Sequence, residues 1–141
     1  MCDYRYFFPI NVSYSDIDAQ GHVNNTRYGT YIESARLAYL QHLGLWDGED
    51  FQQLGVIVAD VHITYRLPLF YGQQIEVGAR VSHIGSKSLK FEFIIRDAES
   101  KAICATGETI NVGFDYTKEV STPISTHWRN IIGEFEGQPF S

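Results

Sequence analysis

The sequence predicts an α+β fold in which one antiparallel sheet wraps around a single long helix. Three observations predict it. Residues 6–14 alternate with a period of two, the apolar residues of positions 28–43 recur every three or four residues, and four further alternating segments follow. A helix with a broad apolar face and a sheet with one apolar face are most simply buried against each other. The alternative is an open α+β sandwich, with the helix lying on one face of the sheet.

The first strand is expected at residues 6–14, where every second residue belongs to one apolar face: Tyr6, Phe8, Ile10, Val12 and Tyr14. Pro9 has no backbone N–H to donate to a neighbouring strand. We therefore expect this strand at an edge of the sheet or at a bulge.

The long helix is expected to begin at one of three capping residues, Asn24, Asn25 or Thr26, and to end at Gly44, which suits a left-handed C-terminal cap. A helix of about 18 residues is on the order of 27 Å long, which is enough to cross a small sheet. Small residues keep one side of this helix thin, which suits close packing on the strands: Gly29, Ala35 and Ala38.

The remaining strands are expected at residues 56–67, 75–84, 88–96 and 102–114. The short polar connections at residues 85–87 and 97–100 are typical of an antiparallel meander. Residues 122–135 predict a short closing helix with Pro123 at its start. We expect residues 1–141 to form a single domain, because the chain is long enough for one sizeable core and shows no linker.

The composition excludes several classes of function. The 17 acidic residues outnumber the 11 lysines and arginines, and the resulting net charge of −6 argues against nucleic-acid binding. Neither the two cysteines, Cys2 and Cys104, nor the five histidines show metal-ligand spacing, so no metal site is expected. No apolar run reaches the length of a membrane span, and the first residues do not form a signal peptide. We expect a cytoplasmic protein.

The residues most suited to chemistry are Asp16-x-Asp18-x-x-Gly21-His22-Val23-Asn24-Asn25, which lead into the long helix. The first amides of a helix have no internal partner and can hold a developing oxyanion. A carboxylate beside them can attack a thioester or activate water, and the imidazole of His22 can share the proton transfer. The same residue types also suit helix caps and turns, so their spacing alone leaves a purely structural role open.

Residues 14–28, Tyr-Ser-Asp-Ile-Asp-Ala-Gln-Gly-His-Val-Asn-Asn-Thr-Arg-Tyr, and residues 33–36, Glu-Ser-Ala-Arg, resemble the signature of the hotdog-fold acyl-CoA thioesterases of the 4-hydroxybenzoyl-CoA thioesterase type. The resemblance implies a hotdog fold, in which a five-stranded antiparallel sheet wraps around one long helix. It also implies a homodimer with active sites at the dimer interface, and often a dimer of dimers. The run from His22 to Asn25 is similar to acyl-carrier-protein thioesterases as well.

This resemblance implies roles for individual residues. Asp18 takes the place of the catalytic carboxylate, which is a nucleophile or a general base, and the backbone N–H of Asn25 takes that of the oxyanion donor. His22 lies at the place of a catalytic histidine of the carrier-protein enzymes. The candidate substrate-binding residues are Asn24, Tyr28 and Glu33, although an aromatic residue such as Tyr28 on the apolar face of the helix also suits the core. Glu33 either senses a polar acyl terminus or forms an ion pair at the dimer contact.

Coenzyme A needs positive charge for its phosphates. The resemblance places Lys87, Ser88 and Lys90 at the hairpin where the family meets the nucleotide, although the lysines also suit a solvated strand edge. The expected reaction is the hydrolysis of fatty or aromatic acyl-CoA to the free acid and coenzyme A. It needs no cofactor beyond the coenzyme A of the substrate. The alternatives are an acyl-carrier-protein thioesterase and a non-catalytic acyl-CoA-binding domain.

Overall fold

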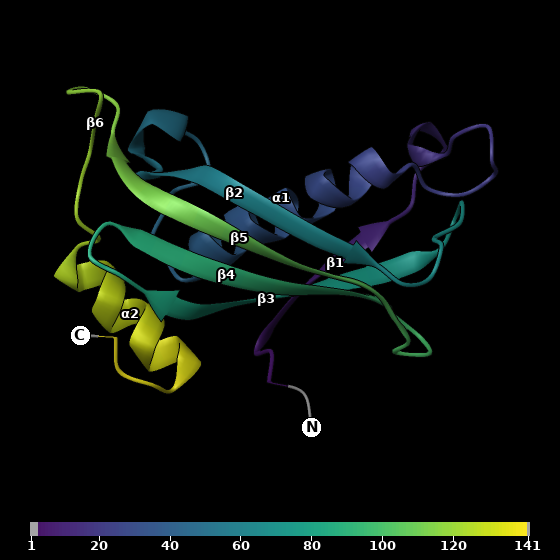
Figure 1. Ribbon diagram of the computed structural model, residues 1–141. Coiled ribbons are helices and arrows are strands. Elements are labelled where there is room, and N and C mark those ends of the chain that lie inside the picture. Colours follow the sequence, from purple (N-terminus) through teal and green to yellow (C-terminus); the bar gives the residue numbers. More distant parts are fainter. Residues whose placement is uncertain (1–2, 141) are drawn as a thin grey trace.

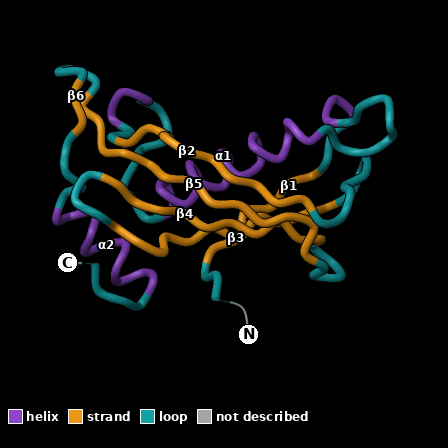
Figure 2. The backbone as a smooth tube through the Cα atoms, viewed as in Figure 1, coloured by secondary structure: helices purple, strands orange, loops and turns teal. Residues whose placement is uncertain are grey.

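The computed structural model describes residues 3–140 as one antiparallel sheet curled around a long helix (Figures 1 and 2). The elements follow in the order β1 (Tyr6–Asn11), α1 (Asn25–His42), β2 (Val56–Tyr65), β3 (Gln74–Ile84), β4 (Ser88–Asp97), β5 (Ile103–Asp115), β6 (Val120–Ser121) and α2 (Thr126–Glu136), with short 3-10 turns at Tyr14–Asp16 and Phe51–Gln53. The α+β class and the wrapped helix are therefore as the sequence predicts.

The strands are joined in the order β1-β3-β4-β5-β2, and every pairing is antiparallel. The predicted meander is confirmed for β3, β4 and β5. In contrast, β2 pairs with the far side of β5 rather than with β3, and the short β6 adds to β5. β1 and β2 consequently lie at the two ends of this order, so Pro9 lies in a terminal strand, as its missing donor predicts.

Helix α1 begins and ends where the sequence predicts. The side-chain oxygen of Asn24 accepts a hydrogen bond of 2.9 Å from the Thr26 N–H, and Gly44 follows the helix with a positive φ of 75°. Its buried face consists of Tyr28, Tyr31, Ile32, Ala35, Arg36, Tyr39 and Leu40. This face packs against β1, β3 and β4.

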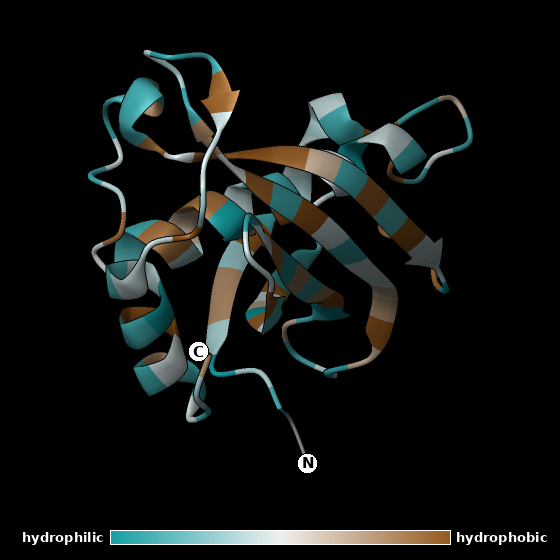
Figure 3. Ribbon diagram, turned by 60° about the vertical axis from the view of Figure 1, so that its left-hand side comes forward, coloured by the Kyte–Doolittle hydropathy of each residue, from teal (hydrophilic) through white to brown (hydrophobic). Residues whose placement is uncertain are grey.

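The core lies between α1 and the inner face of the sheet. Along β4, and along β3 as far as Val81, every second side chain is buried, and the alternation is visible as bands along the strands in Figure 3. Phe91 lies at the centre of this core, with its ring 5.2 Å from that of Tyr39 and 5.6 Å from that of Phe93.

The first strand is shorter than predicted. It ends at Asn11, and Tyr14 lies in the following 3-10 turn with 81% of its surface exposed. The prediction that the strand continues to residue 14 was therefore wrong. The cause is Asp16, whose side-chain oxygen accepts a hydrogen bond of 3.0 Å from the Ser13 N–H. This bond gives the backbone an alternative to the strand ladder.

Strand β2 ends at Tyr65, two residues earlier than predicted, and its alternation changes phase. A bulge between Val58 and Asp60 adds one residue to β2 relative to β5. As a result Val58 and Val61 line the same groove against α1, although a strict period of two places them on opposite faces.

The closing helix begins later than predicted. Ser125, not Pro123, precedes α2, and its hydroxyl oxygen accepts a hydrogen bond of 3.1 Å from the Trp128 N–H. Arg129 on this helix donates a hydrogen bond of 2.5 Å to the carbonyl oxygen of Gly85. This contact fixes α2 at the end of the sheet where β3 turns into β4 (Figure 1).

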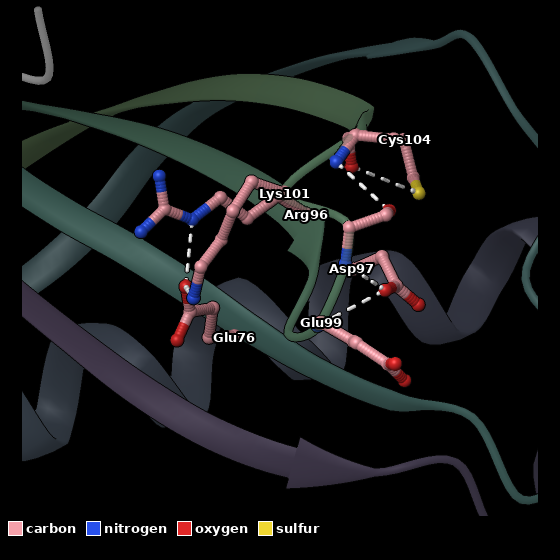
Figure 4. Close-up of polar contacts among 8 residues, drawn as sticks. Glu76, Arg96, Asp97, Glu99, Lys101 and Cys104 are labelled. Atoms are coloured by element: carbon pink, nitrogen blue, oxygen red, sulfur yellow. Dashed lines mark hydrogen bonds and ion pairs between the residues drawn. The ribbon is translucent and has the colours of Figure 1, made fainter.

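The turn between β4 and β5 is held by Asp97, and Figure 4 shows its contact with Glu99 beside the ion pair of Glu76 with Arg96. The carboxylate of Asp97 accepts hydrogen bonds from the N–H groups of Ser100 (2.8 Å) and Glu99 (3.0 Å) and from the side chain of Gln73 (2.9 Å). The bond from the Ser100 backbone is the main reason that the pKa of Asp97 is lowered to about 2.

Among the described residues, no helix is long and apolar enough to cross a membrane. Cys104 is buried and unpaired, and burial raises the pKa of its thiol. Cys2 lies outside the described residues.

Candidate active site at the start of helix α1

The loop of residues 17–23 forms a closed turn that leads into α1. Ile17 and Val23 pair as an isolated antiparallel bridge, and the Asp18 N–H donates to the carbonyl oxygen of His22 at 3.2 Å. Inside the turn, the Gly21 N–H donates to the carbonyl oxygen of Asp18 at 3.0 Å. Gly21 has a φ of 85°, a conformation that other residues adopt only with strain.

The carboxylate of Asp18 is held from two sides. One oxygen accepts a hydrogen bond of 2.9 Å from the Gln20 N–H, and the other accepts one of 3.3 Å from the side-chain amide of Asn24. Asp18 is half-buried. Because Asn24 is also the cap of α1, this contact ties the carboxylate to the start of the helix.

The first backbone N–H groups of α1 differ in whether they have a hydrogen-bond acceptor. Asn24 accepts from the Thr26 N–H with its side-chain oxygen (2.9 Å) and from the Arg27 N–H with its carbonyl oxygen (2.9 Å). Within residues 3–140 no acceptor is found for the N–H of Asn25. This amide is therefore available for an external acceptor at the positive end of the helix dipole.

His22 lies in the same loop, but its ring makes other contacts. Nδ1 lies 3.4 Å from the carbonyl oxygen of Val23, and the ring meets that of Phe70 edge to face at 6.5 Å. In the part of the chain that the structure describes, no contact joins this ring to the carboxylate of Asp18.

Asp16 anchors the loop to helix α1, a role that the sequence did not predict. Its carboxylate accepts a hydrogen bond of 2.8 Å from the Tyr31 hydroxyl and lies 3.6 Å from Nε of Arg27. Burial, and then the bond to Asp16, raise the pKa of Tyr31, so the hydroxyl remains a donor. Asp16 and Tyr31 are 15 residues apart in the sequence, and no local sequence pattern predicts a contact over this separation.

A groove runs from the start of α1 along β2. Its volume is about 430 Å³, and it is lined from α1 by Thr26, Gly29, Thr30, Ile32 and Glu33 and from β2 by Val58 and Val61. Glu33 forms a two-point ion pair with Arg36, at 3.1 and 2.8 Å. Tyr28 does not line the groove, because it is only 2% exposed and packs edge to face on Tyr65 at 4.9 Å.

Gly29 does not serve the close packing that the sequence predicts. A Cβ added at this position meets no atom within 4 Å, whereas one added at Gly113 would overlap the carbonyl oxygen of Thr122. Ala35, in contrast, is fully buried as expected. The missing side chain of Gly29 therefore leaves open space in the groove.

Two of the predicted nucleotide-binding residues, Lys87 and Ser88, lie at the end of the sheet remote from the start of α1. Gly113, which pairs with Val56 at the start of β2, donates to the carbonyl oxygen of Lys87 at 2.8 Å. Tyr65 at the end of β2 donates through its hydroxyl to the carbonyl oxygen of Asn25 at 3.2 Å. Ten residues of strand separate the two ends, which is roughly 30 Å. A single chain thus does not bring Lys87 or Ser88 to Asp18. Lys90 lies level with the middle of β2, because it pairs with Ile110, which also pairs with Asp60.

The two lysines make polar contacts within the chain. Lys90 forms an ion pair of 3.0 Å with Glu108, and Nζ of Lys87 lies 3.4 Å from the hydroxyl of Ser121. Ser88 is half-buried, and its carbonyl oxygen accepts from the Gly85 N–H at 2.7 Å. Among the described residues, no three His, Cys, Asp or Glu side chains come together in a way that could hold a metal ion.

The sequence profile of the thioesterase-like superfamily matches residues 12–132. This range includes the loop, α1 and the strands β2 to β6. The chain belongs to the thioesterase-like superfamily.

Individual members of the superfamily are similar over most of their length. The acyl-CoA thioesterase YbgC of Haemophilus influenzae is 32% identical over 94 residues, which cover 65% of this chain and 69% of the relative. A thioesterase from Thermus thermophilus, in complex with coenzyme A and zinc, is 27% identical and superimposes with a TM-score of 0.86, covering 99% of this chain and 100% of its own. A thioesterase-superfamily protein from Jannaschia has the same fold, with a TM-score of 0.86 at 24% identity over 98% and 87% of the two chains.

The hotdog fold is thereby confirmed, as is the thioesterase family implied by the motif around Asp18. Membership in the thioesterase-like superfamily supports thioester hydrolysis as the chemistry of this chain.

Proposed function

We propose that the protein hydrolyses acyl-CoA thioesters at the start of α1. The observation that carries this proposal is the placement of the Asp18 carboxylate, which is bonded to Asn24, beside a helix whose first N–H, that of Asn25, has no acceptor among the described residues. Acyl transfer from a thioester needs a nucleophile or base and an oxyanion donor. The similarity to an acyl-CoA thioesterase supports coenzyme A as the carrier.

In this mechanism the thioester carbonyl oxygen accepts a hydrogen bond from the Asn25 N–H. Asp18 removes a proton from water, and the oxygen of that water forms a bond to the carbonyl carbon. The tetrahedral oxyanion is stabilised by the amide and the helix dipole. It collapses with cleavage of the C–S bond, and the proton held by Asp18 passes to the leaving sulfur. In the alternative route Asp18 itself attacks, and water then hydrolyses the resulting anhydride.

We propose that two copies of the chain build each complete site. β2 is a terminal strand, and its residues 59–62 are exposed. Antiparallel pairing of two β2 strands places the start of one beside the end of the other. The hairpin carrying Lys87 and Lys90 of one copy would then lie near the Asp18 loop of the other, where it can meet the coenzyme A phosphates. A homodimer is thus the expected functional unit, and a dimer of dimers stays a prediction.

The test is a steady-state assay of a panel of acyl-CoA substrates that follows the released thiol. We expect enzyme-dependent release of free coenzyme A without added metal or redox cofactor. Tight binding of acyl-CoA with no product after hours at high protein concentration would contradict hydrolysis and favour the non-catalytic acyl-CoA-binding domain.

The acyl-carrier-protein alternative is tested with one acyl chain on both carriers. We expect the higher kcat/KM with acyl-CoA. A higher value with the acyl-carrier protein would reassign the carrier while leaving the chemistry unchanged.

Two substitutions of Asn24 separate its capping role from its contact with Asp18. Asn24→Ala removes both and should lower the free energy of unfolding by about 1 kcal/mol. Asn24→Ser keeps a capping oxygen but has no amide donor for Asp18, so its stability should stay close to that of the wild type. Both should lower kcat roughly tenfold, because a hydrogen bond to a charged group is lost. Urea unfolding and the thiol assay measure the two effects. An unchanged kcat in Asn24→Ser would show that the contact of Asn24 with Asp18 does not contribute to catalysis.

A further inference from the structure

The groove along α1 and β2 starts next to the proposed reaction site. Its first lining residue, Thr26, directly follows Asn25, whose N–H is the proposed oxyanion donor. The groove then continues along Gly29 and Ile32 of the helix, opposite Val58 and Val61 of β2. Its volume of about 430 Å³ is within the usual range of small-molecule sites.

Gly29 is not explained by the fold of the chain itself. A glycine inside a helix makes the helix less stable than alanine would. Neither backbone nor packing requires one here, because Gly29 does not have a positive φ and an added Cβ meets no atom within 4 Å. The space in front of Gly29 is therefore free for a group that is not part of the described chain.

We propose that the acyl group of the substrate lies in this groove and that the missing side chain at position 29 sets how large an acyl group is accepted. This inference rests on the proposed acyl-CoA hydrolysis. With the carbonyl at Asn25, Gly29 lies one helical turn away, about 6 Å along the helix axis. An acetyl group ends before it, whereas a medium-length or aromatic acyl group passes it. The substrates are thus acyl-CoA thioesters with apolar acyl groups bulkier than acetyl, in contact with Ile32, Val58 and Val61.

The experiment compares kcat/KM for octanoyl-CoA and acetyl-CoA in the wild type, Gly29→Ala and Gly29→Leu. Ser34→Leu, which places the same leucine side chain on α1 outside the groove lining, is the control. We expect the wild type and Ser34→Leu to prefer octanoyl-CoA. Gly29→Leu should lower the octanoyl-to-acetyl ratio at least about tenfold, with the acetyl value nearly unchanged, because the pocket rejects the larger group sterically.

Gly29→Ala provides a milder second variant. It should lower the same ratio less than Gly29→Leu does and raise the thermal midpoint, since alanine favours the helix.

Several results would overturn this inference. An octanoyl-to-acetyl ratio that stays constant in both Gly29 variants, or an equal loss on both substrates, would place the acyl group elsewhere. A constant ratio together with a changed oligomeric mass in light scattering would show that a second copy of the chain covers the groove. If the wild type releases no thiol from any acyl-CoA, the proposed function and this inference fall together. Turnover with a constant ratio overturns the inference alone.

Discussion

Replacement of Asp18 by asparagine is expected to lower kcat for acyl-CoA hydrolysis at least about 100-fold, the effect typical of a positioned acid–base or nucleophilic group. The amide of Asn is neither a base nor a nucleophile toward a thioester. Its carbonyl oxygen can still accept the hydrogen bond that Asp18 receives from the Gln20 N–H. The loop should therefore stay folded, and the loss should appear in kcat, measured by thiol release.

The matched control is Glu99→Gln, which neutralises an exposed carboxylate that lies in the turn between β4 and β5 and, in the described part of the structure, makes no contact with Asp18. Its kcat should equal that of the wild type. Circular dichroism and thermal unfolding of Asp18→Asn establish that the fold is retained. Turnover near that of the wild type in a folded Asp18→Asn protein would show that another group performs the chemistry.

The largest expected loss of stability follows from Phe91→Ala. Phe91 is completely buried between α1 and the sheet, in contact with the rings of Tyr39 and Phe93. Removing a buried aromatic ring leaves a cavity and typically lowers the free energy of unfolding by about 3–5 kcal/mol. Urea unfolding followed by tryptophan fluorescence measures this change.

Phe51→Ala is the corresponding control, since Phe51 is 61% exposed. It should lower the free energy of unfolding much less than Phe91→Ala does, because little buried apolar surface returns to water. Equal losses in the two variants would contradict the placement of Phe91 at the centre of the core.

The sequence predicted α1 and the inner strands well because their signals are local. The helix boundaries depend on Asn24 and Gly44, which act on their immediate neighbours. The errors occur where a partner distant in sequence or an extra residue decides the local structure. The bulge of β2 at Ala59 depends on its pairing with β5, which no pattern within β2 reveals.

The candidate site was predictable in part for the same reason. Asp18, Asn24 and Asn25 lie within one short segment, so their proximity at the start of α1 follows from the chain itself. The groove depends instead on how the bulged β2 lies relative to α1, and open space beside Gly29 leaves no mark in the sequence. Likewise, the distance between Lys87 and Asp18 follows only from the order of the strands.

The hydrogen bonds that Asp16 accepts from Ser13 and Tyr31 have a consequence for the energetics of the proposed hydrolysis. Together with the bridge between Ile17 and Val23, they fix the loop that carries Asp18 when the protein folds. The conformational entropy of the loop is then lost before any ligand arrives, and association does not have to restrict it again. In the proposed hydrolysis, the attraction between protein and substrate would thus remain available to hold the scissile bond in a reactive orientation, which is the advantage of a preorganised site.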